Sequence, residues 1–150
     1  MEDAVDSLAA AYVPGYSSLA ENRDFSLSMR IELVRSLRLC PTRLLGAADA
    51  VRLIRNDFAH ELSIATFDAC KPKHLASIRG HLQQIQPAMV KDKSDREVFV
   101  NLVGMVRMAL RGYSFHVDRL NTYVRTVPEF RESLRQHCVK AYPQVTPKQG

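Results

Sequence analysis

The sequence contains no tryptophan, few cysteines and no long apolar segment. The three cysteines, Cys40, Cys70 and Cys138, are an odd number without Cys-x-x-Cys spacing, which argues against a disulfide scaffold or a zinc knuckle. No apolar run approaches the ~20 residues that a bilayer span requires, and the acidic start of the chain is unlike a signal peptide. We therefore expect a cytoplasmic protein that does not contact a membrane.

Signals for strands, phosphate loops and metal sites are also missing. The sequence has no convincing alternation of apolar and polar residues, no Asn-Gly or Asp-Gly turn and only scattered single glycines. His74 and His81 share a helical face, but two turns place them ~10 Å apart. One ion with bonds of ~2 Å does not bridge that distance. We predict no metal and no other cofactor.

Arginine, by contrast, is abundant. Lys and Arg together number 21 and Asp and Glu number 16, so the net charge is +5, and fifteen of the basic residues are arginine. Such a balance permits an anionic partner without requiring one, because arginine also forms ordinary ion pairs. The length of 150 residues fits one domain. We predict a helical domain over residues 1–142 and a disordered tail over 143–150.

The spacing of apolar residues predicts one long helix in the C-terminal half. Ser94 and Glu97 form a capping-box pattern at its start, and Pro128 marks its end. A helix of roughly thirty residues needs packing partners along its length, so we expect a bundle or a second subunit, and a homodimer in particular. The apolar stripe consists of Phe99, Leu102, Val103, Val106, Leu110, Tyr113, Val117, Leu120, Val124 and Val127.

Shorter helices are predicted upstream of the long one. They cover about residues 3–13, the segments that follow the caps Ser26 and Thr42, and the segment that starts at Pro72. A further short helix is predicted after Thr126. The fold class is therefore all-α: a single-domain bundle of five or six helices with one long helix in the C-terminal half.

One short segment, residues 54–60, combines residue types that carry chemistry. Arg55 can fork onto a phosphate, His60 can transfer protons near neutral pH, and Asn56 can hydrogen-bond either partner. Together they suit metal-free cleavage of a phosphodiester by the neighbouring ribose hydroxyl. On one continuous helix, however, Arg55 and His60 lie ~140° apart. They converge only if the helix ends between them or if two chains contribute. The alternative is local: Arg55 pairs with Asp57 or Glu61, and His60 is satisfied at a helix end.

The pattern Arg55-Asn56-x-x-x-His60 resembles the Arg-x4–6-His motif of the HEPN superfamily, in which Asn commonly follows the Arg. The stretch from Phe25 to His60 is similar, more specifically, to the mannitol operon repressor (MtlR) family. Members of that family carry Phe-Ser-x-x-x-Arg-Ile and, some way downstream, Ile-Arg-Asn-x-Phe-Ala-His. The resemblance covers residues 24–68, and residues 38–40, Arg-Leu-Cys, depart from the Gly-Leu-Ile that is frequent there.

The resemblance implies two main functions. Catalytic HEPN domains are helical dimers that cleave RNA without metal. By analogy, Arg55 would stabilise the phosphorane, His60 would act as acid or base or bind the phosphate, and Asn56 would orient the site. MtlR-like proteins are instead linked to repression of an operon. The sequence has no helix-turn-helix signature, so a repressor would act through a regulatory protein partner. A third alternative is a structural partner of a separate nucleotidyltransferase.

A basic face on the predicted long helix is a candidate nucleic-acid-binding surface. Arg96, Arg107, Arg111 and Arg125 fall within roughly 60° of one another, about 120° from the centre of the apolar stripe. This row could touch RNA phosphates. The alternative is a merely solvated face, and Asp118 falls in the same arc and weakens its charge.

Overall fold

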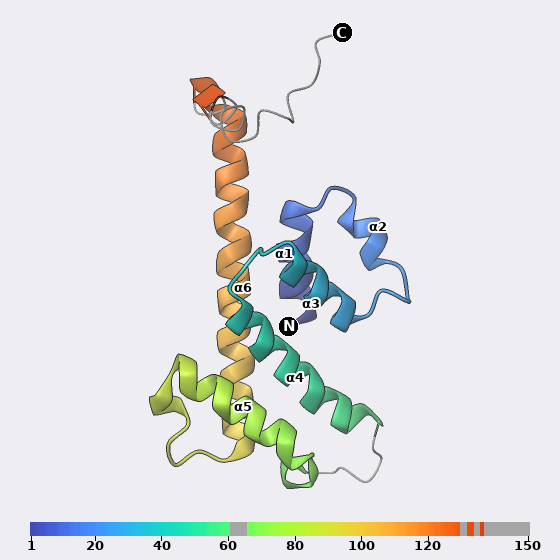
Figure 1. The fold of residues 1–150 in the computed structure, drawn as a ribbon, viewed down its shortest axis with the longest axis vertical. Coiled ribbons are helices and arrows are strands. Elements are labelled where there is room, and N and C mark those ends of the chain that lie inside the picture. Colours follow the sequence, from blue (N-terminus) through green and yellow to red (C-terminus); the bar gives the residue numbers. More distant parts are fainter. Residues whose placement is uncertain (61–65, 130–131, 134–135, 137–150) are drawn as a thin grey trace. The chain divides into compact units, whose positions relative to one another are not determined.

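The computed structural model describes residues 1–60, 66–129, 132–133 and 136, and all the regular structure in these residues is helical (Figure 1). The predicted all-α fold with one long helix in the C-terminal half is confirmed. The predicted tail, residues 143–150, and Cys138 lie outside the described residues. The elements are α1 (Glu2–Tyr12), α2 (Tyr16–Ala20), α3 (Leu27–Ser36), α4 (Thr42–His60), a 3-10 helix (Phe67–Ala69), α5 (Pro72–Ile85), a second 3-10 helix (Pro87–Met89) and α6 (Asp95–Thr126).

Local hydrogen bonds explain where several helices begin. The hydroxyl of Ser94 accepts a bond from the Glu97 N–H at 3.3 Å, and the Glu97 carboxylate accepts one from the Ser94 N–H at 2.9 Å. The Ser94 N–H, the Lys93 ammonium and the Ser94 hydroxyl all donate to the Glu97 carboxylate, and these three bonds lower its pKa to about 2. The predicted capping box therefore starts α6. Ser26 caps α3, and Pro72 occupies the first turn of α5, both as predicted.

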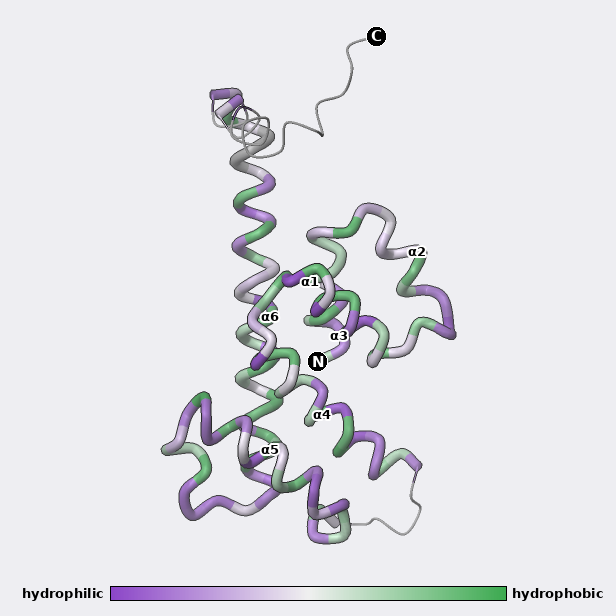
Figure 2. The backbone as a smooth tube through the Cα atoms, viewed as in Figure 1, coloured by the Kyte–Doolittle hydropathy of each residue, from purple (hydrophilic) through white to green (hydrophobic). Residues whose placement is uncertain are grey.

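The chain forms two units, Met1–Ser114 and Phe115–Gly150. Helices α1, α3, α4, α5 and the first part of α6 supply the core of the first unit (Figure 1). Hydrophobic and hydrophilic residues alternate along these helices, so that each can turn an apolar side to the core (Figure 2). The largest fully buried side chains are Leu8, Ile31, Leu45, Ile54, Ile78, Leu82, Leu102 and Leu110.

The predicted stripe on α6 is buried over only part of its length. Leu102, Val106 and Leu110 are fully buried, and Val98, which the prediction omitted, is fully buried as well. Tyr113, a predicted stripe residue, is 37% exposed. In the second unit, Val117 is buried and Leu120 is exposed. The stripe therefore identified the helix and its inner face but not where the neighbouring helices end.

No helix in the described part of the chain is both long enough and apolar enough to cross a membrane. The short helix α2, which follows the left-handed residue Gly15, was not among the predicted helices.

Candidate functional site

Residues 54–60 form the last two turns of α4. Upstream, Leu45, Ala48 and Val51 hold the helix in the core, and Ile54 continues that buried face. Because α4 runs unbroken to His60, the helix does not end between Arg55 and His60. The two side chains therefore lie ~140° apart around one axis. One chain alone does not bring them together through α4.

Asp57 is the residue of this segment that the fold uses internally. Its side chain is only 3% exposed, and one carboxylate oxygen accepts a hydrogen bond from His74 Nδ1 at 2.7 Å and from the Lys71 N–H at 3.3 Å. The Lys71 ammonium lies 3.5 Å from the other oxygen. Burial acts to raise the pKa of Asp57, but the bonds from His74 and Lys71 outweigh it, so the pKa lies below its usual value. Asp57 thus ties the end of α4 to the start of α5.

Phe58 adds an aromatic attachment to the same two turns. Its ring meets Phe67 edge-on, with centroids 5.1 Å apart, and Phe67 lies 5.2 Å from the ring of Phe99 on α6. Asp57 therefore holds the end of α4 against α5, and Phe58 holds it against the 3-10 helix Phe67–Ala69. The backbone that carries Arg55, Asn56 and His60 is therefore fixed in place.

Arg55 and His60 are left on the surface, and Asn56 is half-buried. Arg55 is 60% exposed and pairs with Glu2 at the start of α1. The sequence suggested Asp57 or Glu61 as the partner of Arg55. Asp57 is instead bound to His74, and Glu61 lies outside the described residues. Glu2 is 53 positions away from Arg55 along the chain, so no local spacing could have identified it.

The predicted basic face is tied to the same end of α1. Asp3 accepts hydrogen bonds from Arg107 at 3.0 Å and from Arg111 at 2.9 Å. The amino group at Met1 contributes most to holding the pKa of Asp3 well below its usual range, and these arginines add to the effect. Glu2 and Asp3 are adjacent, so the fold brings Arg55 of α4 and Arg107 and Arg111 of α6 to one acidic pair.

The other two predicted arginines are not part of this group. Arg96 is exposed and lines a shallow groove of about 480 Å³ with Phe58, Phe67 and Asp95. Arg125 belongs to α6, and its side chain lies outside what the structure describes. The predicted row of four therefore includes one pair of arginines that share a carboxylate, while Arg96 lies beside the aromatic contacts of residues 54–60.

Of the other described histidines, His74 and His81 take part in the packing, whereas His116 is exposed on α6. His74 binds Asp57, and the ring of His81 lies against Gly46, where a Cβ atom would come within 2.9 Å of its Cε1 atom. Within residues 1–60, 66–129, 132–133 and 136, no three His, Cys, Asp or Glu side chains are grouped so that they could hold a metal ion. No family model, curated protein or solved structure matches this chain.

Proposed function

We propose that this protein is a metal-independent endoribonuclease of the HEPN type, with Arg55, Asn56 and His60 as its catalytic residues. The observation that carries the proposal is the arginine group, which consists of Arg55, Arg107 and Arg111 around Glu2 and Asp3. Two features found separately in the sequence, the motif arginine and one pair of arginines from the predicted basic face, meet there. The surface next to the motif is thus suited to a chain of phosphates.

The charges of this arginine group favour an anionic ligand. Arg55, Arg107, Arg111 and the amino group at Met1 bring four positive charges against the carboxylates of Glu2 and Asp3, a local balance of 4 − 2 = +2. All three ion pairs are exposed, and such pairs contribute only about 0–1 kcal/mol each. A phosphate accepts bidentate bonds from a guanidinium at least as well as a carboxylate does. An RNA backbone can therefore replace Glu2 and Asp3 as the partner.

The proposed reaction is an internal phosphoryl transfer. The ribose 2′-hydroxyl loses its proton to a base and its oxygen bonds to the adjacent phosphorus, while the bond from phosphorus to the 5′-oxygen breaks. An acid protonates the departing 5′-oxygen, so the products are a 2′,3′-cyclic phosphate and a free 5′-hydroxyl. His60 is suited to one of the proton transfers. Arg55 stabilises the negative charge of the phosphorane, and Asn56 orients the phosphate.

A second copy of the chain completes this site in the proposal. Arg55 and His60 diverge on α4, so His60 of one protomer would meet Arg55 of its partner over the same phosphate. Both side chains are exposed and can approach a partner without unfolding α4. The rigid attachment through Asp57 and Phe58 then sets the geometry of each half-site.

The test is RNA cleavage in EDTA by the wild type and by His60→Ala. His116→Ala is the matched control, since His116 is also exposed on a helix but lies outside the motif. We expect wild type and His116→Ala to release fragments with cyclic phosphate ends, and His60→Ala to be slower by about 100-fold or more. Equal rates for His60→Ala and His116→Ala would refute the catalytic assignment.

The second candidate is a non-catalytic regulator that acts through protein contacts, as in the MtlR family. The divergence of Arg55 and His60 favours it, because one chain alone does not assemble a catalytic pair. Apolar side chains that face solvent on α6 favour it as well: Met108 is 71% exposed and Val100 is 58% exposed.

Transcript profiling separates the two functions. Cells that lack the protein are complemented with the wild type or with His60→Ala. A regulator predicts the same transcript profile for both, because His60 has no chemical role. A ribonuclease predicts that His60→Ala leaves the profile of the deletion unchanged.

A further inference from the structure

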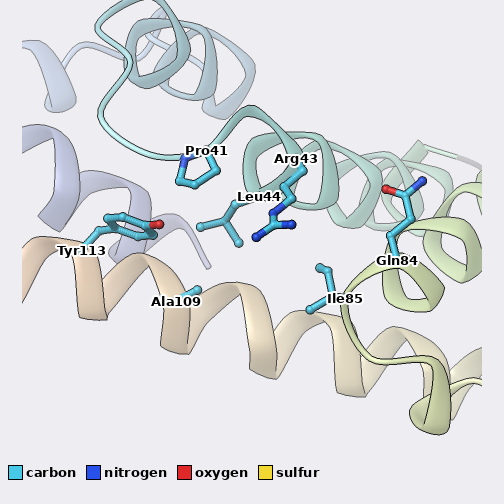
Figure 3. A pocket seen from close by; sticks show the side chains of 7 residues that line it. All are labelled: Pro41, Arg43, Leu44, Gln84, Ile85, Ala109 and Tyr113. Atoms are coloured by element: carbon cyan, nitrogen blue, oxygen red, sulfur yellow. The ribbon is translucent and has the colours of Figure 1, made fainter.

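A small pocket lies at the opposite end of α4 from residues 54–60, between the start of α4, the end of α5 and the middle of α6 (Figure 3). Its volume is about 190 Å³. Arg43 at this end and Arg55 are twelve residues apart on one helix, which corresponds to ~18 Å. The pocket is therefore separate from the proposed ribonuclease site, and its residues all belong to the unit Met1–Ser114.

Three helices supply apolar walls to this pocket. Leu44 of α4 is buried and forms part of the floor, Ile85 comes from the last turn of α5, and Ala109 comes from α6. Pro41 closes the side where the chain enters α4. In Figure 3 these side chains surround a common space. A ligand that fills it would remove apolar surface from water.

Arg43 is the charged group of the pocket. Its guanidinium points into the space between Leu44 and Ile85 (Figure 3). No acidic residue lines the pocket, and no carboxylate in the described part of the chain lies within ion-pair distance of Arg43. Most arginines near it in sequence are paired: Arg35 with Glu32 and Arg52 with Asp49. Arg43 is exposed, so it brings an unpaired positive charge to the solvent-open edge of the pocket, which the polar residue Gln84 also lines.

The helix dipoles give no net preference, because the pocket lies both at the start of α4, where the dipole is positive, and at the end of α5, where it is negative. A second hydrogen-bond donor comes from α6. Tyr113 of α6 turns its hydroxyl toward Pro41 and Leu44 (Figure 3), and this hydroxyl has no hydrogen-bond partner within the described residues. A guanidinium and a hydroxyl are therefore both available to acceptor oxygens.

We propose that this pocket binds a small monocarboxylate with an apolar body. The carboxylate would accept two parallel hydrogen bonds from the guanidinium of Arg43, and the apolar body would lie on Leu44, Ile85 and Ala109. The planar fork matches a carboxylate, and a single uncompensated charge matches a monoanion. The proposal does not depend on RNA cleavage, because it uses none of the residues of the ribonuclease site.

The probes are benzoate and hexanoate, with benzamide and hexanamide as uncharged partners of the same shape. Binding to the full chain is followed by backbone amide shifts in two-dimensional NMR. We expect the carboxylates to shift the amides of Arg43, Leu44 and Ala109, with a Kd of about 1 mM or tighter. Arg43→Gln should weaken binding at least tenfold, roughly the effect of losing a charged hydrogen bond.

Arg23→Gln is the matched control, because Arg23 is exposed but lies in the loop before α3. It should leave the Kd unchanged within about twofold. Ala109→Leu, which adds bulk to the wall opposite Arg43, should abolish the shifts while the rest of the spectrum shows a folded protein. The proposal is wrong if the amides bind as tightly as the acids. It is also wrong if Arg23→Gln and Arg43→Gln weaken binding equally, or if 10 mM carboxylate leaves the pocket amides unshifted.

Discussion

Asp57→Asn should destabilise the protein by about 1.5 kcal/mol. One oxygen of Asp57 accepts from both His74 Nδ1 and the Lys71 N–H. Asparagine keeps one oxygen for these donors but loses the negative charge, and a hydrogen bond to a charged group contributes about 1.5–3 kcal/mol. Part of that loss is offset, because the buried charge no longer has to be desolvated. The amide NH₂ would face Lys71 Nζ, which can move away because it is half exposed.

The assay is urea unfolding followed by circular dichroism, with a thermal scan in parallel. For a cooperative unit of the size of Met1–Ser114, 1 kcal/mol corresponds to about 4 °C, so we expect the Tm to fall by about 6 °C. Asp49→Asn is the matched control: Asp49 lies on the same helix and pairs with Arg52, but its side chain is 36% exposed whereas that of Asp57 is 3% exposed. Its change should stay within about 0.5 kcal/mol. Equal effects of the two substitutions would refute the reasoning.

The pH dependence gives a second check on the same carboxylate. The pKa of Asp57 in the folded protein lies below its usual value of 3.8. Its ionised form therefore stabilises the fold fully above that value, and the contribution is lost as the pH falls through the lowered pKa. The difference in stability between wild type and Asp57→Asn should shrink as the pH falls below about pH 4. A difference that grows between about pH 4 and about pH 2 would show that the pKa of Asp57 is raised.

Three further predictions concern the surface of α1 and α6. Glu2→Gln frees Arg55 and should tighten RNA binding severalfold in a filter assay at low salt, while the free energy of unfolding changes by less than about 1 kcal/mol. Asp3→Asn removes the acidic partner that Arg107 and Arg111 share. It should lower the free energy of unfolding in urea by roughly 0.5–1 kcal/mol and should increase the salt dependence of RNA binding. Weaker RNA binding by either variant would contradict the proposal that the arginine group binds RNA. Gly104→Ala should stabilise α6 by about 0.5–1 kcal/mol, because a Cβ atom there meets nothing within 4 Å; a lower Tm would contradict this.

The helices could be predicted because their signals are local. The capping box of Ser94 and Glu97 links atoms three residues apart, and Pro72 limits the backbone at its own position. The apolar stripe of α6 also follows from the period of one helix. Which members of the stripe become buried depends on where other helices end, so Leu110 is fully buried and Tyr113 is 37% exposed.

The partners of residues 54–60 could not be predicted, since they come from distant parts of the chain. Asp57 binds His74 across 17 positions, Arg55 meets Glu2 across 53, and Arg107 meets Asp3 across 104. An α-helix relates residues three or four apart, and no spacing rule reaches further. The residue types of the motif are therefore given by the amino acids alone, and the chemistry assigned to them remains a prediction. Which of its side chains anchor the helix and which face solvent follows from how α1, α4, α5 and α6 pack.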